Sequence, residues 1–135
     1  MTISKDIKFD CAHMLSGYEG KCANLHGHTY HGTVTIEGDI DASTGMLLDY
    51  NEIKKVVDKY DHAIIFSSVD LRYTAEEDLL GWAQKNNMRY VVLPFGKSTA
   101  EVLALTIAEE FDHYGKVTVR LSETDGSWAE AEAHA

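Results

Sequence analysis

Cysteine and proline are scarce in this chain, which has only Cys11, Cys22 and Pro94 of these types. Two cysteines are too few for a disulfide scaffold, so in a reducing compartment each is a packing residue, a metal ligand or a nucleophile. No linker, low-complexity tract or internal repeat interrupts the sequence. A chain of 135 residues can build one hydrophobic core, and we expect a single domain over 1–135.

Positive charge and long apolar runs are also lacking. The chain has 12 basic and 22 acidic residues, a formal net charge of -10, which argues against nucleic acid or an anionic membrane surface as a partner. Residues 1–6 lack the features of a signal peptide, and no later apolar run is long enough to span a bilayer. We therefore expect a cytoplasmic protein that binds a small molecule or another protein.

Alternating apolar residues predict two strands near the N-terminus. Over 3–13 the odd positions share one face, and over 26–37 the even positions do so. The inward faces then include His13, His26 and His28, whereas His31 lies on the opposite face.

The remaining periodicity predicts helices and further strands. Apolar residues recur at helical spacing over 49–60 and again from 98 to 111, where Ser98 and Glu101 match a capping box. Residues 70–96 are interpreted as an added helix, with Thr74 and Glu77 as its capping box, and a short strand without obvious chemistry. Alternation over 117–123 predicts the last strand, and 129–135 is expected to fray, with His134 in solvent. The pattern is α+β, an antiparallel sheet with helices on one side.

The inward-facing histidines suggest a metal site. His26 and His28 project from the same face of one strand and can approach one ion at about 2.0 to 2.1 Å. His13 reaches that face from the neighbouring strand, and three histidines with an open fourth position are typical of catalytic zinc. The alternative is that each histidine is a core residue with a hydrogen-bonded partner.

Two further residues carry possible chemistry. Cys22 lies in a glycine-rich loop before His26 and is either a fourth ligand that closes a structural site or a base or nucleophile beside an open metal position. Cys11, on a strand, is read as a small core residue. Glu123 ends the inward-facing series of the last strand, where a carboxylate must be paired or bind something.

The motifs resemble those of the 6-pyruvoyl/6-carboxytetrahydropterin synthase family. The likeness rests on six stretches in the family's order, namely 9–13, 22–28, 45–50, 61–62, 98–101 and 123–124. It implies a tunnelling fold, in which a four-stranded antiparallel sheet with helices on one face oligomerises into a barrel. It also implies a homo-oligomer, a trimer or a hexamer, with active sites between subunits.

The resemblance also implies roles for individual residues. His13, His26 and His28 look like the zinc ligands and Cys22 like the catalytic thiol, while Asp61 and His62 look like a relay supplied by the neighbouring subunit. Thr99 and Glu101 match substrate-binding positions, although the family has proline where this chain has Ser98. Glu123 looks like the pterin anchor, because a carboxylate can accept from the 2-amino group and the adjacent ring N–H together.

The implied activity is that of a zinc-dependent lyase acting on 7,8-dihydroneopterin triphosphate. The short interval between Cys22 and His26 favours the branch that makes 6-carboxy-5,6,7,8-tetrahydropterin for queuosine, with release of acetaldehyde and triphosphate. The alternative within the family is 6-pyruvoyltetrahydropterin synthase, which retains the side chain. Two readings of other classes are a non-catalytic zinc-stabilised assembly module and a metal-dependent hydrolase.

Overall fold

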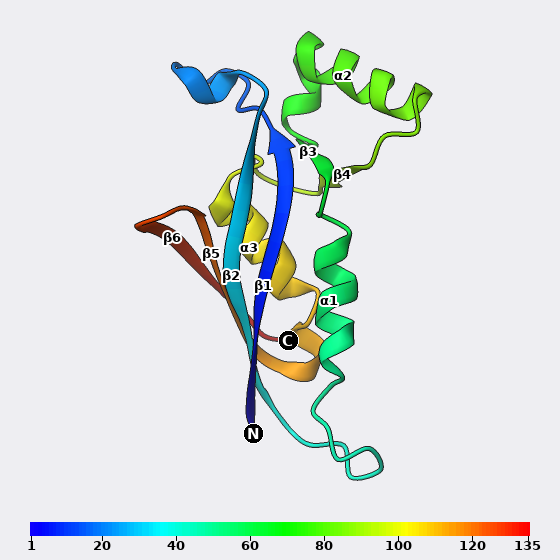
Figure 1. The fold of residues 1–135 in the computed structure, drawn as a ribbon, viewed down its shortest axis with the longest axis vertical. Helices are drawn as coiled ribbons and strands as arrows, with labels where there is room; N and C mark the ends of the chain where they lie inside the picture. Colours follow the sequence, from blue (N-terminus) through cyan, green and yellow to red (C-terminus); the bar gives the residue numbers. More distant parts are fainter.

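The fold is built on a mixed six-stranded sheet (Figure 1). The computed structural model describes residues 1–135. The strand order is β4-β3-β1-β2-β5-β6, with antiparallel β1–β2, β2–β5 and β5–β6 pairs and parallel β1–β3 and β3–β4 pairs. The strands are β1 (Thr2–His13), β2 (His26–Gly38), β3 (Ala63–Ser67), β4 (Tyr90–Leu93), β5 (Gly115–Thr124) and β6 (Ser127–Ala133). The expectation of four antiparallel strands was therefore wrong.

The alternation predicted for the first two strands is confirmed. Alternate residues of β1, from Ile7 to His13, are buried, and Tyr30, Val34 and Ile36 are buried on β2. His31 is exposed, as its position in the alternation requires. The two strands form one long hairpin in which His13 is the direct partner of His26.

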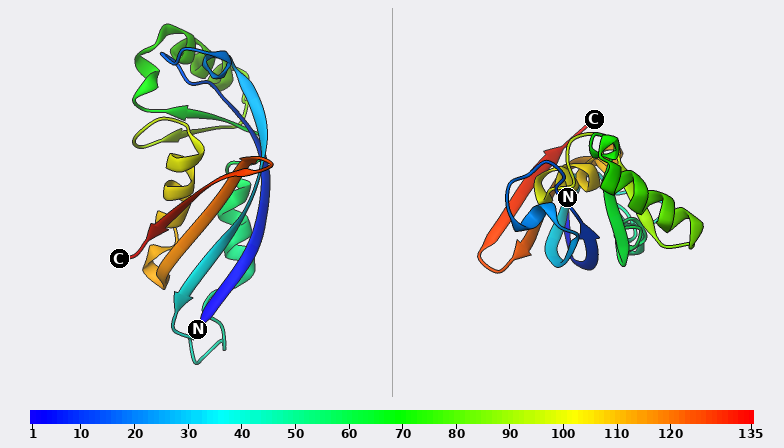
Figure 2. Two further views of the ribbon diagram at one scale, coloured as in Figure 1. Left: turned by 90° about the vertical axis from the view of Figure 1, so that its left-hand side faces the viewer. Right: turned by 90° about the horizontal axis from the view of Figure 1, so that it is seen from above.

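Helices α1 (Tyr50–Asp58) and α3 (Ala100–Glu109) cover the same face of the sheet (Figure 2). Asp49 caps α1 by accepting from the Asn51 amide at 2.8 Å, which satisfies one of the free N–H groups of its first turn. The helices bury Ile53 and Ile107 in a hydrophobic core that also takes residues from β1, β2 and β5. None of the helices has the length and apolar character that crossing a membrane requires.

Both predicted capping boxes were wrong. Thr99, not Ser98, is the N-cap of α3, and its hydroxyl accepts from the Val102 amide at 3.3 Å. Ser98 is instead buried, and its hydroxyl donates to the Met14 carbonyl at 3.4 Å. Thr74 is the first residue of α2 (Thr74–Lys85), which has no capping side chain. Helix α3 therefore begins one residue later, and α2 one residue earlier, than the capping-box pattern predicted.

The C-terminal segment forms an edge strand and does not fray. β6 pairs with β5, and its alternate residues Ala129 and Ala131 pack against the core while Ala133 is buried. The Arg120 guanidinium lies 3.5 Å from the centroid of the Trp128 ring, a cation–π contact that ties the two strands together. Only His134 behaves as expected, exposed beyond the end of the strand.

The added segment contains the predicted helix and short strand, but also two buried acids that were not foreseen. It comprises the 3-10 turn η2 (Asp70–Arg72), α2 and β4, and α2 projects away from the sheet (Figure 1). Asp70 and Glu76 are both 0% exposed. The Lys97 ammonium donates to Asp70 Oδ1 at 2.8 Å. We refer to the two buried acids Asp70 and Glu76, together with the half-exposed Lys97, as the buried acidic cluster.

We predict that Glu76→Gln removes a pH-dependent loss of stability. Burial, and secondly the charge of Asp70 on η2, raise the pKa of Glu76 from 4.5 to about 7, against the opposing effects of Ser16 after β1 and Lys97 before α3. Between these values the folded state binds a proton that the unfolded state has released, so the free energy of unfolding falls as pH rises. In thermal melts from pH 5 to 8, the melting temperature of the variant should rise with pH relative to that of the wild-type protein. Parallel pH curves would contradict the prediction.

Candidate metal centre

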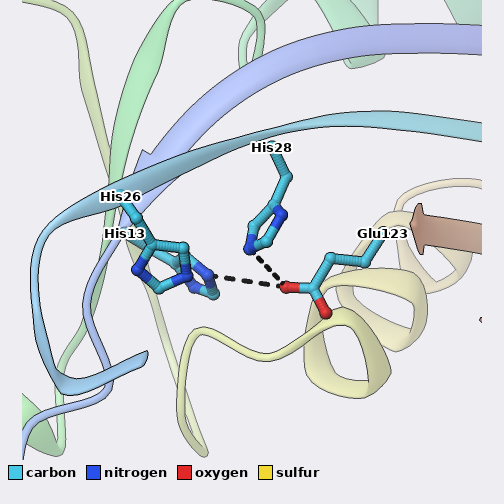
Figure 3. A group of neighbouring side chains, drawn as sticks. All are labelled: His13, His26, His28 and Glu123. Atoms are coloured by element: carbon cyan, nitrogen blue, oxygen red, sulfur yellow. Dashed lines mark ion pairs between the residues drawn. The ribbon is translucent and has the colours of Figure 1, made fainter. Parts of the chain in front are cut away.

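Three imidazoles converge at the end of the β1–β2 hairpin. His13 is the last residue of β1, and His26 and His28 lie at the start of β2 on the same face. The ring centroids are 4.6 Å apart for His13 and His26, 4.7 Å for His26 and His28, and 5.3 Å for His13 and His28. Figure 3 shows these rings and the carboxylate of Glu123 pointing toward one another. The hairpin thus brings together the three histidines that strand alternation placed on one face.

Backbone carbonyls orient two of these rings. His13 Nδ1 lies 2.5 Å from the Ser98 carbonyl oxygen, and His26 Nδ1 lies 2.6 Å from that of Asn24. A carbonyl only accepts, so each Nδ1 carries the proton and each Nε2 keeps a lone pair. Burial is the main cause that lowers the pKa of His13, which keeps its ring neutral near pH 7. This tautomer is the one that metal-binding histidines adopt when a second partner holds the other nitrogen.

The Nε2 atoms of all three histidines are buried and have no hydrogen-bond partner. A buried polar nitrogen without a partner is unfavourable, and three at one point are not explained as core histidines with satisfied hydrogen bonds. The donor atoms of His13, His26, His28 and Glu123 all lie within 4.8 Å of one another. The four groups therefore form a cluster that can hold a metal ion.

Glu123 reaches this cluster from β5. Its Oε1 lies 2.8 Å from His28 Nε2, outside hydrogen-bond geometry, and 3.6 Å from His13 Nε2. The β2–β5 ladder ends at the pair of His31 and Ser122, and the β5–β6 register shifts between Leu121 and Thr124. Glu123 itself is paired in neither ladder. A polar cavity of about 610 Å³ lies beside this contact, and its lining includes both His28 and Glu123.

The two cysteines have different environments. Cys22 is exposed in the 3-10 turn η1 (Lys21–Ala23) and is not among the four clustered groups. Cys11 is buried as predicted, and burial, helped by nearby carboxylates, raises its pKa to about 12, so its thiol stays protonated. Of the two, only Cys22 is accessible for chemistry.

Asp61 and His62 lie together but on the other side of the sheet. His62 Nδ1 is 3.1 Å from Asp61 Oδ1, and the Asp10 amide donates to the same oxygen at 2.9 Å, a bond that is the main cause lowering the pKa of Asp61. Both neighbour the exposed side chain of Asp10, on the face opposite His13. His62 is 74% exposed and lines a cavity of about 410 Å³. Neither residue belongs to the cluster of the three histidines and Glu123, although His28 lines the same cavity as His62.

Thr99 and Glu101 lie at the N-terminus of α3, directly after the carbonyl that holds His13. Thr99 is occupied as the helix cap, and Glu101 is exposed in the first turn. Burial above all, then the nearby charges of Cys11, Glu123 and Glu101, raise the pKa of the Tyr30 phenol.

The sequence did not predict that the backbone carbonyls of Ser98 and Asn24 orient His13 and His26. A backbone oxygen is present at every residue, so no residue type marks the positions where it becomes a partner of a histidine. The 3-10 turn η3 (Asp112–Tyr114) lies outside the four-residue cluster. The functional cluster therefore draws on β1, β2, β5 and the loop before α3.

The sequence is similar to that of known proteins over nearly its whole length. Residues 2–134 match the family model described as 6-pyruvoyl tetrahydropterin synthase. The chain is 38% identical to the 6-carboxy-5,6,7,8-tetrahydropterin synthase of Haemophilus influenzae, over 95% of this chain and 96% of that protein.

Solved structures show the same fold. The 6-pyruvoyl tetrahydropterin synthase of Plasmodium vivax superposes with a TM-score of 0.63 at 18% identity, over 100% of this chain and 99% of that one. That of Caenorhabditis elegans gives 0.59 at 24% identity, over 98% and 95%. The chain belongs to the 6-pyruvoyl tetrahydropterin synthase family.

Proposed function

We propose that this protein is a zinc-dependent lyase that converts 7,8-dihydroneopterin triphosphate, with consumption of water, to 6-carboxy-5,6,7,8-tetrahydropterin, acetaldehyde and triphosphate. The observation that carries the proposal is the convergence, beside a carboxylate, of three buried Nε2 atoms that have no hydrogen-bond partner. The similarity to the Haemophilus influenzae 6-carboxy-5,6,7,8-tetrahydropterin synthase supports this product over the 6-pyruvoyl one.

The donor set suits zinc held by His13, His26 and His28. Three imidazole nitrogens leave a fourth position for substrate, which is typical of catalytic zinc sites. A zinc ion bound there would polarise the hydroxyl oxygens of the substrate side chain and so acidify the neighbouring C–H bond. The carbonyls of Ser98 and Asn24 keep His13 and His26 in the binding tautomer, as outer partners do in metal sites.

Protein groups would then bind the pterin and move protons. Glu123 accepts from the 2-amino group and ring N–H of the pterin, and Thr99 and Glu101 contribute to substrate binding. Cys22 removes a side-chain proton, and Asp61 orients His62 for proton exchange with the thiol or substrate. Because Asp61 and His62 lie on the face opposite His13, we infer that they serve the site of a neighbouring subunit in a homo-oligomer.

Product analysis tests the proposed reaction. The zinc-loaded protein is incubated with 7,8-dihydroneopterin triphosphate, and pterins, acetaldehyde and triphosphate are quantified. We expect acetaldehyde and 6-carboxy-5,6,7,8-tetrahydropterin in equal amounts. Triphosphate release without acetaldehyde would indicate the 6-pyruvoyl reaction, and no turnover would favour an assembly module.

We predict that Glu123→Gln retains zinc but binds pterin at least about tenfold more weakly. One of the two carboxylate acceptors becomes an amide donor, which faces the donors of the pterin. A hydrogen bond to a charged group contributes about 1.5 to 3 kcal/mol, which sets the expected loss. Zinc content and the pterin dissociation constant are measured together. The position of Glu123 Oε1, 2.8 Å from His28 Nε2, also suits a fourth ligand that closes a structural site. In that case the variant would lose zinc, and the anchoring role would be wrong.

A further inference from the structure

The buried acidic cluster lies at the junction of three segments that the proposed mechanism needs in fixed positions. Asp70 comes from the added segment, whereas Lys97 precedes the loop residue Ser98 that contacts His13. The Lys97 ammonium donates to Asp70 Oδ1 at 2.8 Å and to the Ser16 carbonyl at 3.0 Å. One side chain thus connects the added segment, the loop after β1 and the loop before α3.

Contacts from Ser16 and its neighbours lead directly to Cys22. The Leu15 amide donates to the Cys22 carbonyl at 2.8 Å, so the beginning and end of the Cys22 loop are joined next to the residue that Lys97 holds. At Gly17 a Cβ atom would lie 2.6 Å from the hydroxyl oxygen of Tyr73, which shows how closely this loop approaches the added segment. The position of Cys22 therefore depends on contacts with residues 70–73.

A second path leads from Lys97 to the metal cluster. The next residue, Ser98, offers its carbonyl to His13 Nδ1 at 2.5 Å and its hydroxyl to the Met14 carbonyl at 3.4 Å. A shift of the loop before α3 would move the acceptor that fixes the tautomer and orientation of His13. Loss of such outer partners reduces metal affinity by about 10 to 100-fold in metal sites generally.

Charge explains why Lys97 must be held firmly. Asp70 is 0% exposed, and a buried carboxylate without a partner is strongly unfavourable. Glu76 is also 0% exposed, but neither of its carboxylate oxygens has a hydrogen-bond partner, so the ammonium bonds to Asp70 and not to Glu76. The pair of Lys97 and Asp70 is the contact that neutralises the cluster.

We propose that Lys97 is a positioning residue that, anchored on Asp70, holds both the Cys22 loop and the carbonyl that orients His13, so that the added segment acts as a brace for the metal site. The inference rests on the proposed function only in its metal readout. The brace itself follows from contacts within the chain.

The test compares Lys97→Met, the double variant Asp70→Asn/Lys97→Met and Lys59→Met in the full-length protein. The double variant removes both charges, so it leaves no buried unpaired carboxylate if the single variant folds poorly. Lys59 is the matched control, because it is a half-exposed lysine at the C-cap of α1 and pairs with Glu110 at the C-cap of α3, the end of that helix away from Lys97. Hydrogen exchange of residues 14–24 and zinc affinity are measured for each.

We expect both Lys97 variants to exchange amides of residues 14–24 about tenfold faster or more, while α1 is unchanged, and to bind zinc about tenfold more weakly. Lys59→Met should match the wild-type protein in both readouts. Unchanged exchange in the loop would overturn the inference, as would unchanged zinc affinity in a protein that binds zinc. If the wild-type protein binds no zinc, the proposed function fails, and the exchange data alone decide on the brace.

Discussion

Replacing Cys22 by alanine should leave a folded, fully metallated protein that turns over about 10² to 10⁴ times more slowly. The expected loss is the usual contribution of a positioned acid or base. Metal should stay because the four clustered donor groups do not include Cys22, whose thiol is exposed on η1. Zinc content by elemental analysis, thermal melting and steady-state turnover are measured on the same preparation.

Lys21→Ala is the control for disturbance of the loop, because Lys21 is an exposed neighbour on the same turn. It should keep both zinc and activity. A Cys22→Ala protein that is poor in metal and melts early would show that the thiol closes a structural site, since metal-binding free energy is then part of folding free energy. That result would restore the assembly-module reading.

Removal of His28 should abolish stoichiometric zinc binding, whereas removal of His31 should not. His28 Nε2 is buried in the cluster, and His31, three residues later on β2, is exposed on the opposite face. The loss of affinity in His28→Ala should exceed the roughly 10 to 100-fold effect of losing an outer partner, because a ligand itself is deleted. Zinc titration against a competing chelator measures both variants.

The variants His28→Ala and His31→Ala are matched in residue type, strand and substitution. They differ in the side of the sheet on which the deleted imidazole lies, so a difference in zinc affinity reports on that side. Equal zinc loss in His31→Ala would place the metal elsewhere. Retained zinc in His28→Ala would mean that Glu123 and two histidines suffice, and the three-histidine site would be wrong.

Strand alternation predicted the convergence of the three histidines because backbone geometry dictates it. Successive side chains point to opposite faces, so the positions of His13, His26 and His28 followed once β1 and β2 were assigned. The approach of Glu123 was only partly predictable. The inward orientation of Glu123 followed from alternation. Its contact with His28 depends on the irregular pairing beyond Leu121, which no residue type in the sequence predicts.

Two strands escaped prediction for opposite reasons. The run Ala63–Ser67 is almost wholly buried in β3 and shows no alternation, so periodicity could not separate it from a turn after Asp61 and His62. The alanine-rich β6 has weak strand propensity and forms because β5 offers it a pairing edge.

The buried acids escaped prediction because charged residues on a helix are usually solvated. Glu76 faces inward only because residues from the loop after β1 and the loop before α3 meet there, and such meetings of distant segments leave no local pattern. The added segment was therefore predicted in shape but not in the role that we now assign to it.

The β1–β2 hairpin has a consequence for the order in which the site can assemble during synthesis. All three histidines lie between residues 13 and 28, on strands that pair directly, so their contacts are local in sequence. Local contacts form early, and an ion bridging two strands would stabilise a hairpin that is marginal by itself. Glu123 and the loop of Ser98 are made much later. In the proposed mechanism, the nascent chain can thus bind metal first, and the pterin anchor Glu123 and the Lys97 contacts that hold the Cys22 loop are added afterwards.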